Sequence, residues 1–276
     1  MNKDLFDKIK KDIKQTGFVI ELEIGEILRK NQFHTNHNAS YEDKDCHLSR
    51  EIDLTATECY RDKKTNLYVE YHLILEVKKN SDRPWIIFTN PPSYIGYGWR
   101  ILHSSFNTTN KKNSILSSKL IDLDNPLILK NRIGKAYHEL GKTSSDKSKI
   151  YESILSVCKA AYYFKDNVGE EPFKKDFDKN SSVEIHFYIP IIVIDGILVE
   201  VYLENNEPKI EEENWLVMEY EYASQNYLNA SGETEKTFFP IVVRKDYLDE
   251  FILILKKWFN SCNKGLSEEV IKRRSK

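Results

Sequence analysis

The chain has 276 residues, of which 40% are hydrophobic and 30% charged, and its 41 basic and 43 acidic residues give a formal net charge of −2. This composition is typical of a folded protein with a hydrophobic core and excludes a disordered chain. The balanced charge shows no overall basic footprint of a nucleic-acid binder, although a local basic groove is compatible with it.

Cysteine usage and hydropathy predict a cytoplasmic protein that does not enter a membrane. The four cysteines form no CxxC pair and read as free thiols: Cys46, Cys59, Cys158 and Cys262. The first residues, MNKDLFDKIKKDIKQTG, are charged throughout and lack the apolar core of a secretory signal. The most apolar stretch, 187–203, is interrupted by Pro190, Asp195 and Gly196 and is therefore not a membrane span.

The first third of the chain predicts two helices followed by strands. Apolar residues at helical spacing indicate an amphipathic helix over 3–16 and a second helix over 18–30. A polar, histidine-containing loop is expected to follow, up to about residue 48. Strands are then predicted over 50–57, 68–78 and 85–88, with the turn-rich RDKKTN between the first two.

The rest of the chain predicts a mixture of helices and strands. Residues 126–165 look helical, with SSDKS as a break, and 184–203 reads as two strands joined by a hairpin turn at Asp195-Gly196. A strand over 238–243 and a helix over 247–259 follow, and the last residues, KGLSEEVIKRRSK, are expected to fray. With no internal repeat or long linker, we expect one mixed α/β domain over 1–276. Its core would cover about 17–90 and its C-terminal extension about 180–260.

Two of the predicted strands carry charged residues that can meet. Successive side chains of a strand point to opposite faces, so Glu76 and Lys78 share one face of the segment LILEVKK. In REIDLTAT, the residues Ile52, Leu54 and Ala56 are expected on one face and Asp53 on the other. If the two strands pair, Asp53 can stand beside Glu76, and two carboxylates and an ammonium then converge.

Such a convergence suits metal-dependent hydrolysis of a phosphodiester. Mg²⁺ binds one or two carboxylates, keeps several waters and completes its shell with phosphate oxygens. The ion acidifies a bound water and stabilises the charge that develops on the phosphate oxygens. A neighbouring lysine can orient that water or hold the phosphate. Glu21 adds a third acid at the edge of the apolar face of the second helix, where a purely solvated glutamate would be out of place.

In their order along the chain, these residues resemble the PD-(D/E)xK nuclease superfamily. The likeness covers mainly 17–90 and rests on the helix opening GFVIE, on SREIDLTA and on LILEVKKN running into PWIIF. It extends to uncharacterised bacterial members, some of them linked to phage defence. One residue departs from the pattern, because Ile52 stands where the family name places a proline.

The resemblance implies a restriction-endonuclease-like mixed β-sheet flanked by helices and extended by C-terminal strands and a helix. It also implies that Asp53 and Glu76 hold Mg²⁺, for which Mn²⁺ can substitute, that Lys78 is the catalytic lysine, and that Glu21 is an auxiliary acid and further metal ligand. The expected activity is endonucleolytic cleavage of nucleic acid; DNA is favoured over RNA as the substrate, and the choice between them is left open. A homo-oligomer is left open.

Other interpretations of these residues are kept beside the catalytic one. Alternating Glu and Lys on an exposed strand is an ordinary solvated surface, and the fold could be an inactive nuclease domain that binds nucleic acid or a protein partner. AYHELGKT (136–143) fits a loose phosphate-loop pattern, but we expect a helix followed by a loop there. A zinc site could be drawn from His34, His37, Cys46 and His47, although the spacing matches no familiar module.

A set of aromatic and basic residues could stack on bases, although burial is the expected role for most of the aromatic ones. These residues are Arg83, Trp85, Tyr94, Tyr97, Trp99 and Arg100.

Overall fold

The computed structural model describes residues 2–13, 16–91, 106–108, 131–141, 148–166, 183–222, 224–227 and 237–275. Their helices are α1 (Lys3–Ile13), α2 (Phe18–Lys30), α6 (Lys149–Asp166) and α7 (Leu248–Arg274), with the 3₁₀ turn η2 (Lys245–Tyr247) before α7. Their strands are β1 (His34–Asp43), β2 (Leu48–Asp62), β3 (Leu67–Asn90), β4 (Phe106–Thr108), β5 (Ile133–Glu139), β6 (Val183–Glu204), β7 (Glu207–Glu212), β8 (Trp215–Val217), β9 (Tyr220–Glu221), β10 (Thr237–Phe238) and β11 (Ile241–Arg244).

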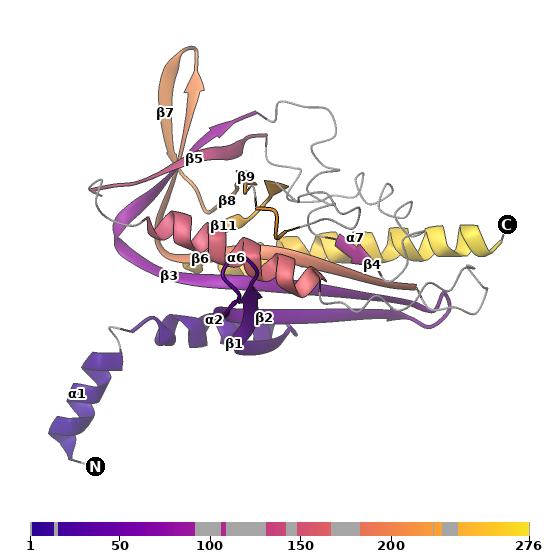
Figure 1. Ribbon diagram of the computed structural model, residues 1–276, viewed down its shortest axis with the longest axis horizontal. Helices are drawn as coiled ribbons and strands as arrows, with labels where there is room; N and C mark the ends of the chain where they lie inside the picture. Colours follow the sequence, from indigo (N-terminus) through magenta and orange to yellow (C-terminus); the bar gives the residue numbers. More distant parts are fainter. Residues whose placement is uncertain are drawn as a thin grey trace.

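Nine of these described strands form one mixed sheet, which confirms the predicted α/β class (Figure 1). The order is β1-β2-β3-β6-β11-β8, while β4 and β7 pair with β6 and β5 pairs with β3. The central strands β3 and β6 run parallel to each other. Residues 189–194 of β6 are all buried, as expected of a strand covered on both faces.

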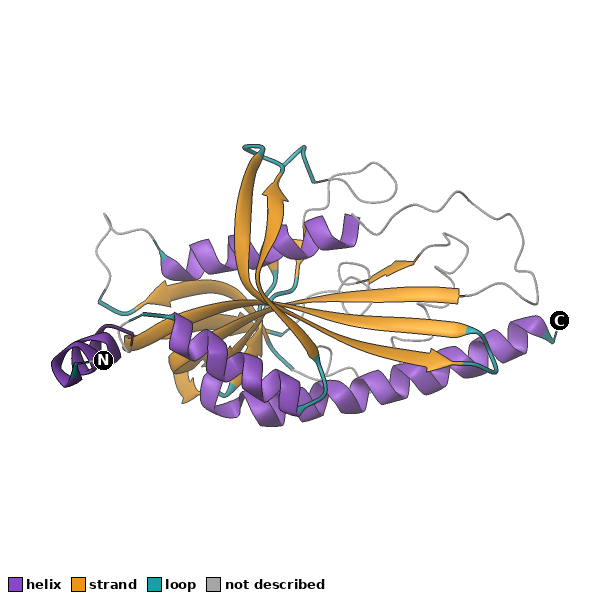
Figure 2. Cartoon of the chain, turned by 90° about the horizontal axis from the view of Figure 1, so that it is seen from below, coloured by secondary structure: helices purple, strands orange, loops and turns teal. Residues whose placement is uncertain are grey.

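Helices cover both faces of the sheet, α6 on one side and α2 with α7 on the other (Figure 2). On the α6 side, Ile74 and Ile192 pack with Ile154 in one hydrophobic cluster. On the opposite side, the cluster combines residues of β3 and β6 with both helices: Leu73, Leu75, Ile191, Ile24, Leu28, Phe251 and Leu255. The alternation of side chains along β3 therefore decides which helix layer each residue contacts.

The edge of β3 changes partner halfway along the strand, and this change positions the candidate site. Residues 54–62 of β2 pair antiparallel with residues 67–75 of β3, and β5 pairs with β3 only from Trp85 onward. The residues of β2 that precede Leu54 pair with β1 alone. Strands β2 and β3 therefore part just where Asp53 and Glu76 follow the last pair.

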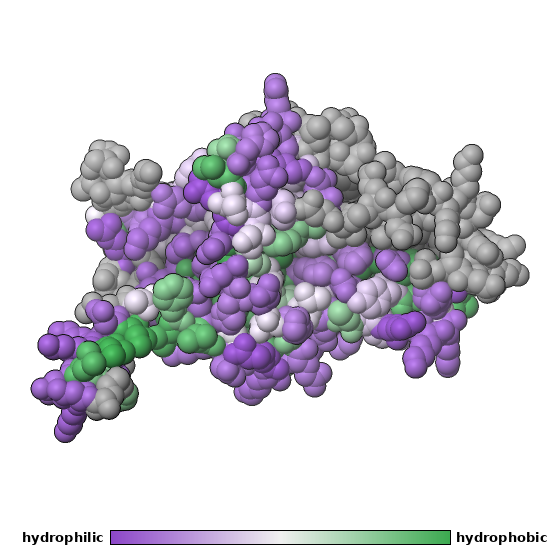
Figure 3. All heavy atoms as spheres, turned by 60° about the horizontal axis from the view of Figure 1, so that its bottom comes forward, coloured by the Kyte–Doolittle hydropathy of each residue, from purple (hydrophilic) through white to green (hydrophobic). Residues whose placement is uncertain are grey.

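The two N-terminal helices form as predicted, and α2 has the predicted bounds. Ile20, Ile24 and Leu28 bury the apolar face of α2. Helix α1 is the more amphipathic of the two, but none of its residues is buried. Its apolar side chains gather along the exposed helix in Figure 3: Leu5, Phe6, Ile9 and Ile13.

The expected polar loop before residue 48 is wrong, because 34–43 form the edge strand β1. Its side chains alternate only between exposed and half-buried positions for most of its length, so no apolar pattern marked it. The expected face of Ile52 is also wrong. Ile52 packs with Tyr41 on the α6 side, whereas Leu54 packs on the α2 side. Asn38 has a positive φ of 52°, and the regular pairing of β1 with β2 skips the Asn38–Asp53 position.

The expected hairpin at Asp195-Gly196 is wrong, because both residues lie inside the continuous strand β6. The neighbouring strand β3 absorbs the irregularity instead, with a register shift between Asn80 and Trp85. The hairpin occurs later, between β6 and β7, at Asn205-Asn206. Both asparagines have positive φ angles, 53° and 65°, as a type I′ turn requires.

Three further expectations need correction. Within the predicted helical region 126–165, residues 149–166 form α6 but 133–139 form the strand β5. Residues 126–130 and 142–147 lie outside the described part. The strand predicted over 238–243 is divided into β10 and β11, with Phe239 and Pro240 between them. The tail does not fray, because α7 continues to Arg274 and buries Leu266 and Val270.

Candidate metal and phosphodiester site

Asp53 occupies the point at which β2 and β3 separate. The last paired residues are Leu54 and Leu75, so Asp53 and Glu76 are the next residues on adjacent strands, as predicted. The Val77 backbone N–H donates a hydrogen bond of 2.6 Å to Oδ2 of Asp53. The Asp53 carboxylate thus accepts a hydrogen bond of the kind that a strand carbonyl usually accepts. This contact fixes Asp53 beside Val77, the residue between Glu76 and Lys78.

Glu76 is buried on the α6 side of the sheet, with 7% of its surface exposed. Its two carboxylate oxygens have different donors. Nζ of Lys78 lies 2.5 Å from Oε1, and the Ser156 hydroxyl of α6 donates to Oε2 at 3.0 Å. The Tyr41 hydroxyl lies 3.5 Å from that of Ser156 and extends the network to β1. Glu76 and Lys78 therefore share one face of β3, as the alternation predicts.

Glu21 of α2 belongs to the same electrostatic cluster. Burial raises the pKa of the Glu21 carboxyl, the negative charge of Asp53 raises it further, and Lys78 opposes both effects. Glu21 is therefore close enough to Asp53 and Lys78 to respond to their charges, as Glu76 is to the same two residues. With all four groups ionised, three negative charges face one positive charge.

The pKa of the buried Glu76 carboxyl is also raised. Burial raises the pKa of Glu76, Lys78 counteracts that rise, and Asp53 adds to it. Burial by itself would lower the pKa of Lys78, but Glu76 and then Asp53 raise it above its usual value. The ammonium is consequently held charged, while the carboxylates lack a full set of positive partners.

A divalent cation fits this donor set, because a hard ion prefers carboxylate oxygens and would balance the excess charge. Asp53 and Glu76 would hold it, with Glu21 available from the α2 side. The three acids do not form a closed triad. Among the described residues, two other groups have three ligand atoms within 4.8 Å of one another, and this one does not. A cation would thus be bound by two acids and water rather than enclosed by three acids.

Two adjacent lysines on β3, Lys78 and Lys79, have different surroundings. Lys79 is exposed, whereas Lys78 is half-buried beside Glu76. Lys79 is the register partner of Asp195 on β6. The two lysines therefore differ in surroundings as well as in face, which makes Lys79 a suitable control.

Sequence reasoning did not identify Ser156 and Tyr41 as parts of the site. Ser156 lies on α6, 80 residues after Glu76, and is half-buried in a helix that contains several other polar residues. Tyr41 lies in the segment expected to be a loop. No local signal therefore distinguished either residue as a partner of Glu76.

The phosphate-loop alternative meets a different obstacle from the one expected. Residues 136–139 are strand, and Ala136 to Glu139 pair with Phe88 to Trp85 of β3. The expected helix is therefore wrong. Because these residues form ladder hydrogen bonds, their amides do not form a phosphate cradle. Gly141 ends the described segment with a φ of 73°, and Lys142 and Thr143 lie outside it.

The zinc and base-stacking alternatives are resolved only in part. His34 and His37 lie on β1 and Cys46 and His47 in the turn after it, and they are not a group of convergent ligand atoms among the described residues. Trp85 is fully buried, which confirms burial as its role. The remaining aromatic residues, Tyr94, Tyr97 and Trp99, lie outside the described residues, as does Arg100.

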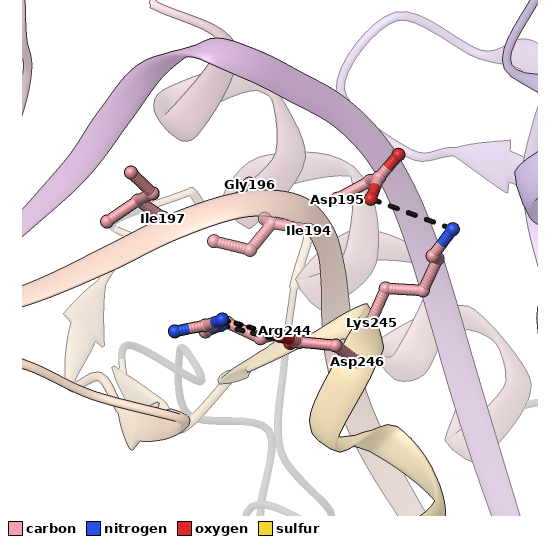
Figure 4. Close-up of a pocket in the computed structure, with 7 residues that line it drawn as sticks. All are labelled: Ile194, Asp195, Gly196, Ile197, Arg244, Lys245 and Asp246. Atoms are coloured by element: carbon pink, nitrogen blue, oxygen red, sulfur yellow. Dashed lines mark hydrogen bonds and ion pairs between the residues drawn. The ribbon is translucent and has the colours of Figure 1, made fainter.

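A cavity of about 310 Å³ lies where β6 approaches the end of β11 (Figure 4). Its walls include Asp195, Arg244 and Lys245. Arg244 is ion-paired with Glu212 and Asp246, and Lys245 lies 3.6 Å from Asp195 and 2.9 Å from Glu23. Arg244 and Lys245 are thus both paired with acidic side chains. None of the four residues of the candidate site lines this cavity.

Replacing Glu21 with glutamine is expected to stabilise the metal-free protein at pH 8. The folded-state pKa of Glu21 is raised, so its ionised form costs stability above that pKa and costs nothing once both states are protonated. The gain in melting temperature should therefore disappear below about pH 4. Glu23→Gln is the control, because Glu23 forms an ion pair with Lys245 and its loss should bring no gain. Equal gains for both variants would contradict the placement of Glu21 in the cluster.

None of the described helices combines the length and the apolar character that a membrane-spanning helix needs. Comparison of the chain with family models, with curated proteins and with solved structures gives no match.

Proposed function

We propose that the chain is a Mg²⁺-dependent nuclease of the PD-(D/E)xK type, with Asp53 and Glu76 as metal ligands and Lys78 as the catalytic lysine. The observation that carries the proposal is the place of Asp53 where β2 leaves β3, bonded to the Val77 N–H between Glu76 and Lys78, which are themselves paired. The sequence resemblance supports it independently, because it names the same residues in the same order.

The side chains have separate tasks in this proposal. The Val77 N–H holds Asp53, and Ser156 holds Glu76, so both carboxylates are fixed before substrate binds. Mg²⁺ bound between them would supply an acidified water and stabilise charge on the phosphate. Lys78 then exchanges its contact with Glu76 for one with the attacking water or a phosphate oxygen. Its raised pKa keeps it positively charged for that role.

One observation favours the second candidate, an inactive domain of this fold that binds nucleic acid or a protein. Both carboxylate oxygens of Glu76 are already engaged, one by Lys78 and the other by Ser156. A site that had lost its metal would keep such an ion pair as a structural contact.

A cleavage assay separates the two candidates. Purified protein is incubated with supercoiled plasmid, single-stranded DNA and RNA in Mg²⁺, in Ca²⁺ and in EDTA. The nuclease predicts Mg²⁺-dependent cleavage that EDTA stops and that Glu76→Gln lacks. Binding of the nucleic acid without cleavage under all conditions would instead favour the inactive domain. Cleavage that persists in Glu76→Gln would overturn the assigned site.

A further inference from the structure

A second group of potential ligands lies on β3 and β6, away from the candidate nuclease site. Oε2 of Glu70 lies 3.0 Å from Nε2 of His72 and 3.1 Å from Nδ1 of His186, and the two ring nitrogens are 3.4 Å apart. Glu70 is the register partner of His186 on β6, and His72 follows two residues later on β3. The side chains are 9–21% exposed, so the group is largely shielded.

These distances suit a bound transition ion. An ion about 2.0–2.1 Å from its nitrogen and oxygen ligands keeps them roughly 2.9 Å apart in an octahedral shell and roughly 3.4 Å apart in a tetrahedral one. All three separations in the group fall within that interval. An ion could therefore contact all three atoms with little movement of the side chains.

Neighbouring residues hold two of the three side chains, His72 and Glu70, in place, as outer partners do around metal centres. The Thr57 hydroxyl lies 3.1 Å from Nδ1 of His72, where it can accept a hydrogen bond from the Nδ1–H. The unprotonated Nε2 then faces Glu70 and His186. The Tyr68 hydroxyl donates to Oε1 of Glu70, the oxygen that faces away from the two rings. Tyr188 stacks on His72 with ring centroids 4.7 Å apart and an interplanar angle of 9°.

We propose that Glu70, His72 and His186 form a binding site for a divalent first-row transition ion such as Zn²⁺. Two imidazoles and one carboxylate favour such an ion over Mg²⁺ or Ca²⁺, which prefer oxygen ligands alone. Three protein ligands leave at least one coordination position for water or a substrate group.

This site is separate from the proposed nuclease site. Glu76 lies four strand residues beyond His72, about 13 Å at the usual rise per residue. Paired catalytic ions are only about 3.5–4 Å apart, so the two sites do not form a two-metal centre. The inference therefore stands or fails independently of the proposed function.

The other described acidic group does not support a comparable inference. Glu200, Glu211 and Glu213 also converge, but Arg132 binds both carboxylate oxygens of Glu200 at 2.8 and 2.9 Å. Thr89 also donates to Glu200. Glu200 is therefore satisfied by protein partners.

Titration of the metal-free protein with Co²⁺ tests the proposal. Wild type should develop a visible d–d absorption that one equivalent of Co²⁺ at this site saturates, Zn²⁺ should abolish the absorption, and millimolar Mg²⁺ should not. His186→Gln should weaken binding by more than the roughly 10–100-fold that loss of an outer partner costs. Exposed His138→Gln and the nuclease-site variant Glu76→Gln should both bind as wild type does.

Circular dichroism would show whether His186→Gln is folded. A second variant tests the site if it is not. Thr57→Val removes an outer partner and keeps all three ligands, so Co²⁺ binding should weaken by about 10–100-fold. Absence of the absorption in wild type, or an unchanged titration in a folded His186→Gln variant, would overturn the proposal. Loss of the signal in Glu76→Gln would place the ion in the other site and overturn it equally.

Discussion

Glu76→Ala is expected to abolish metal-dependent cleavage and to weaken Mn²⁺ binding by more than about a hundredfold, because it removes a ligand and not merely an outer partner. Asp53→Ala should behave in the same way. Lys78→Ala should instead lower the cleavage rate by roughly 10²–10³-fold, the usual cost of one stabilising donor. Mn²⁺ affinity should persist or rise slightly in Lys78→Ala, since Glu76 loses the ammonium that competes with the ion. Calorimetry with Mn²⁺ alongside single-turnover cleavage rates measures both quantities.

Lys79→Ala is the matched control, since Lys79 is the exposed neighbour of Lys78 on the same strand. It should keep most of the activity and the full metal affinity. The assignment of roles on β3 fails if Lys79→Ala is as inactive as Lys78→Ala. A fully active Lys78→Ala variant would contradict it as well.

Lys159→Met is expected to lower the free energy of unfolding at pH 7 by about 3–5 kcal/mol, the usual cost of breaking a buried ion pair from one side. Nζ of Lys159 lies 2.7 Å from Oδ1 of Asp43 and 2.7 Å from Oδ2 of Asp45, with 8% of the lysine side chain exposed. Tyr227 also donates to Asp43. This lysine of α6 thus binds two acids at the end of β1 that also accept hydrogen bonds from Tyr222 and Tyr227, and its removal would leave both acids without their cation.

The deficit in Lys159→Met should depend on pH. Burial raises the pKa of Asp43 and Asp45, but hydrogen bonds from Lys159 and other donors lower both values overall. The stability that they contribute is present above the unfolded pKa of about 3.9 and is lost as pH falls through the folded values. Urea unfolding should therefore show a smaller difference between variant and wild type at pH 3.5 than at pH 7. Lys149→Met, at an exposed position of the same helix, should stay within about 0.5 kcal/mol of wild type. A pH-independent deficit would contradict this account.

The parts of the fold that sequence predicted are those with a strong local signal. Helix α2 has apolar residues at helical spacing from Ile20 to Leu28, and its bounds agree with the prediction. The pairing of β2 with β3 follows from two alternating strands and a short turn, with Asn66 at a φ of 47°. The alternation along β3 also predicted that Glu76 and Lys78 share a face, and the pairing of β2 with β3 put Asp53 and Glu76 on adjacent strands, although the alternation expected around Ile52 was wrong.

Other elements depend on partners that a local pattern does not reveal. β1 is a polar edge strand stabilised by its ladder with β2, so its residues resemble a loop. Asp195-Gly196 has the composition of a turn, yet β6 remains extended because it pairs with β3 before and after that point. The segment Ala136–Glu139 contains good helix formers, but it pairs with β3 and is strand. In each case, tertiary pairing overrides local preference.

The Glu70–His72–His186 group shows the same limitation for a site. His186 is 114 residues from His72 in the chain, and no metal-binding spacing connects them. Only the parallel pairing of β3 with β6 brings them together. By contrast, the alternative group drawn from one polar stretch of sequence, which includes His34 and His47, does not converge in the described residues.

The most direct measurement of the central claim is an anomalous difference map from crystals of the wild-type protein grown with saturating Mn²⁺. The account predicts a Mn²⁺ peak about 2.0–2.6 Å from a carboxylate oxygen of both Asp53 and Glu76. Nζ of Lys78 should lie outside the coordination shell, displaced from its contact with Glu76. A map with no peak between these two carboxylates, or with Mn²⁺ bound only elsewhere, would contradict the account.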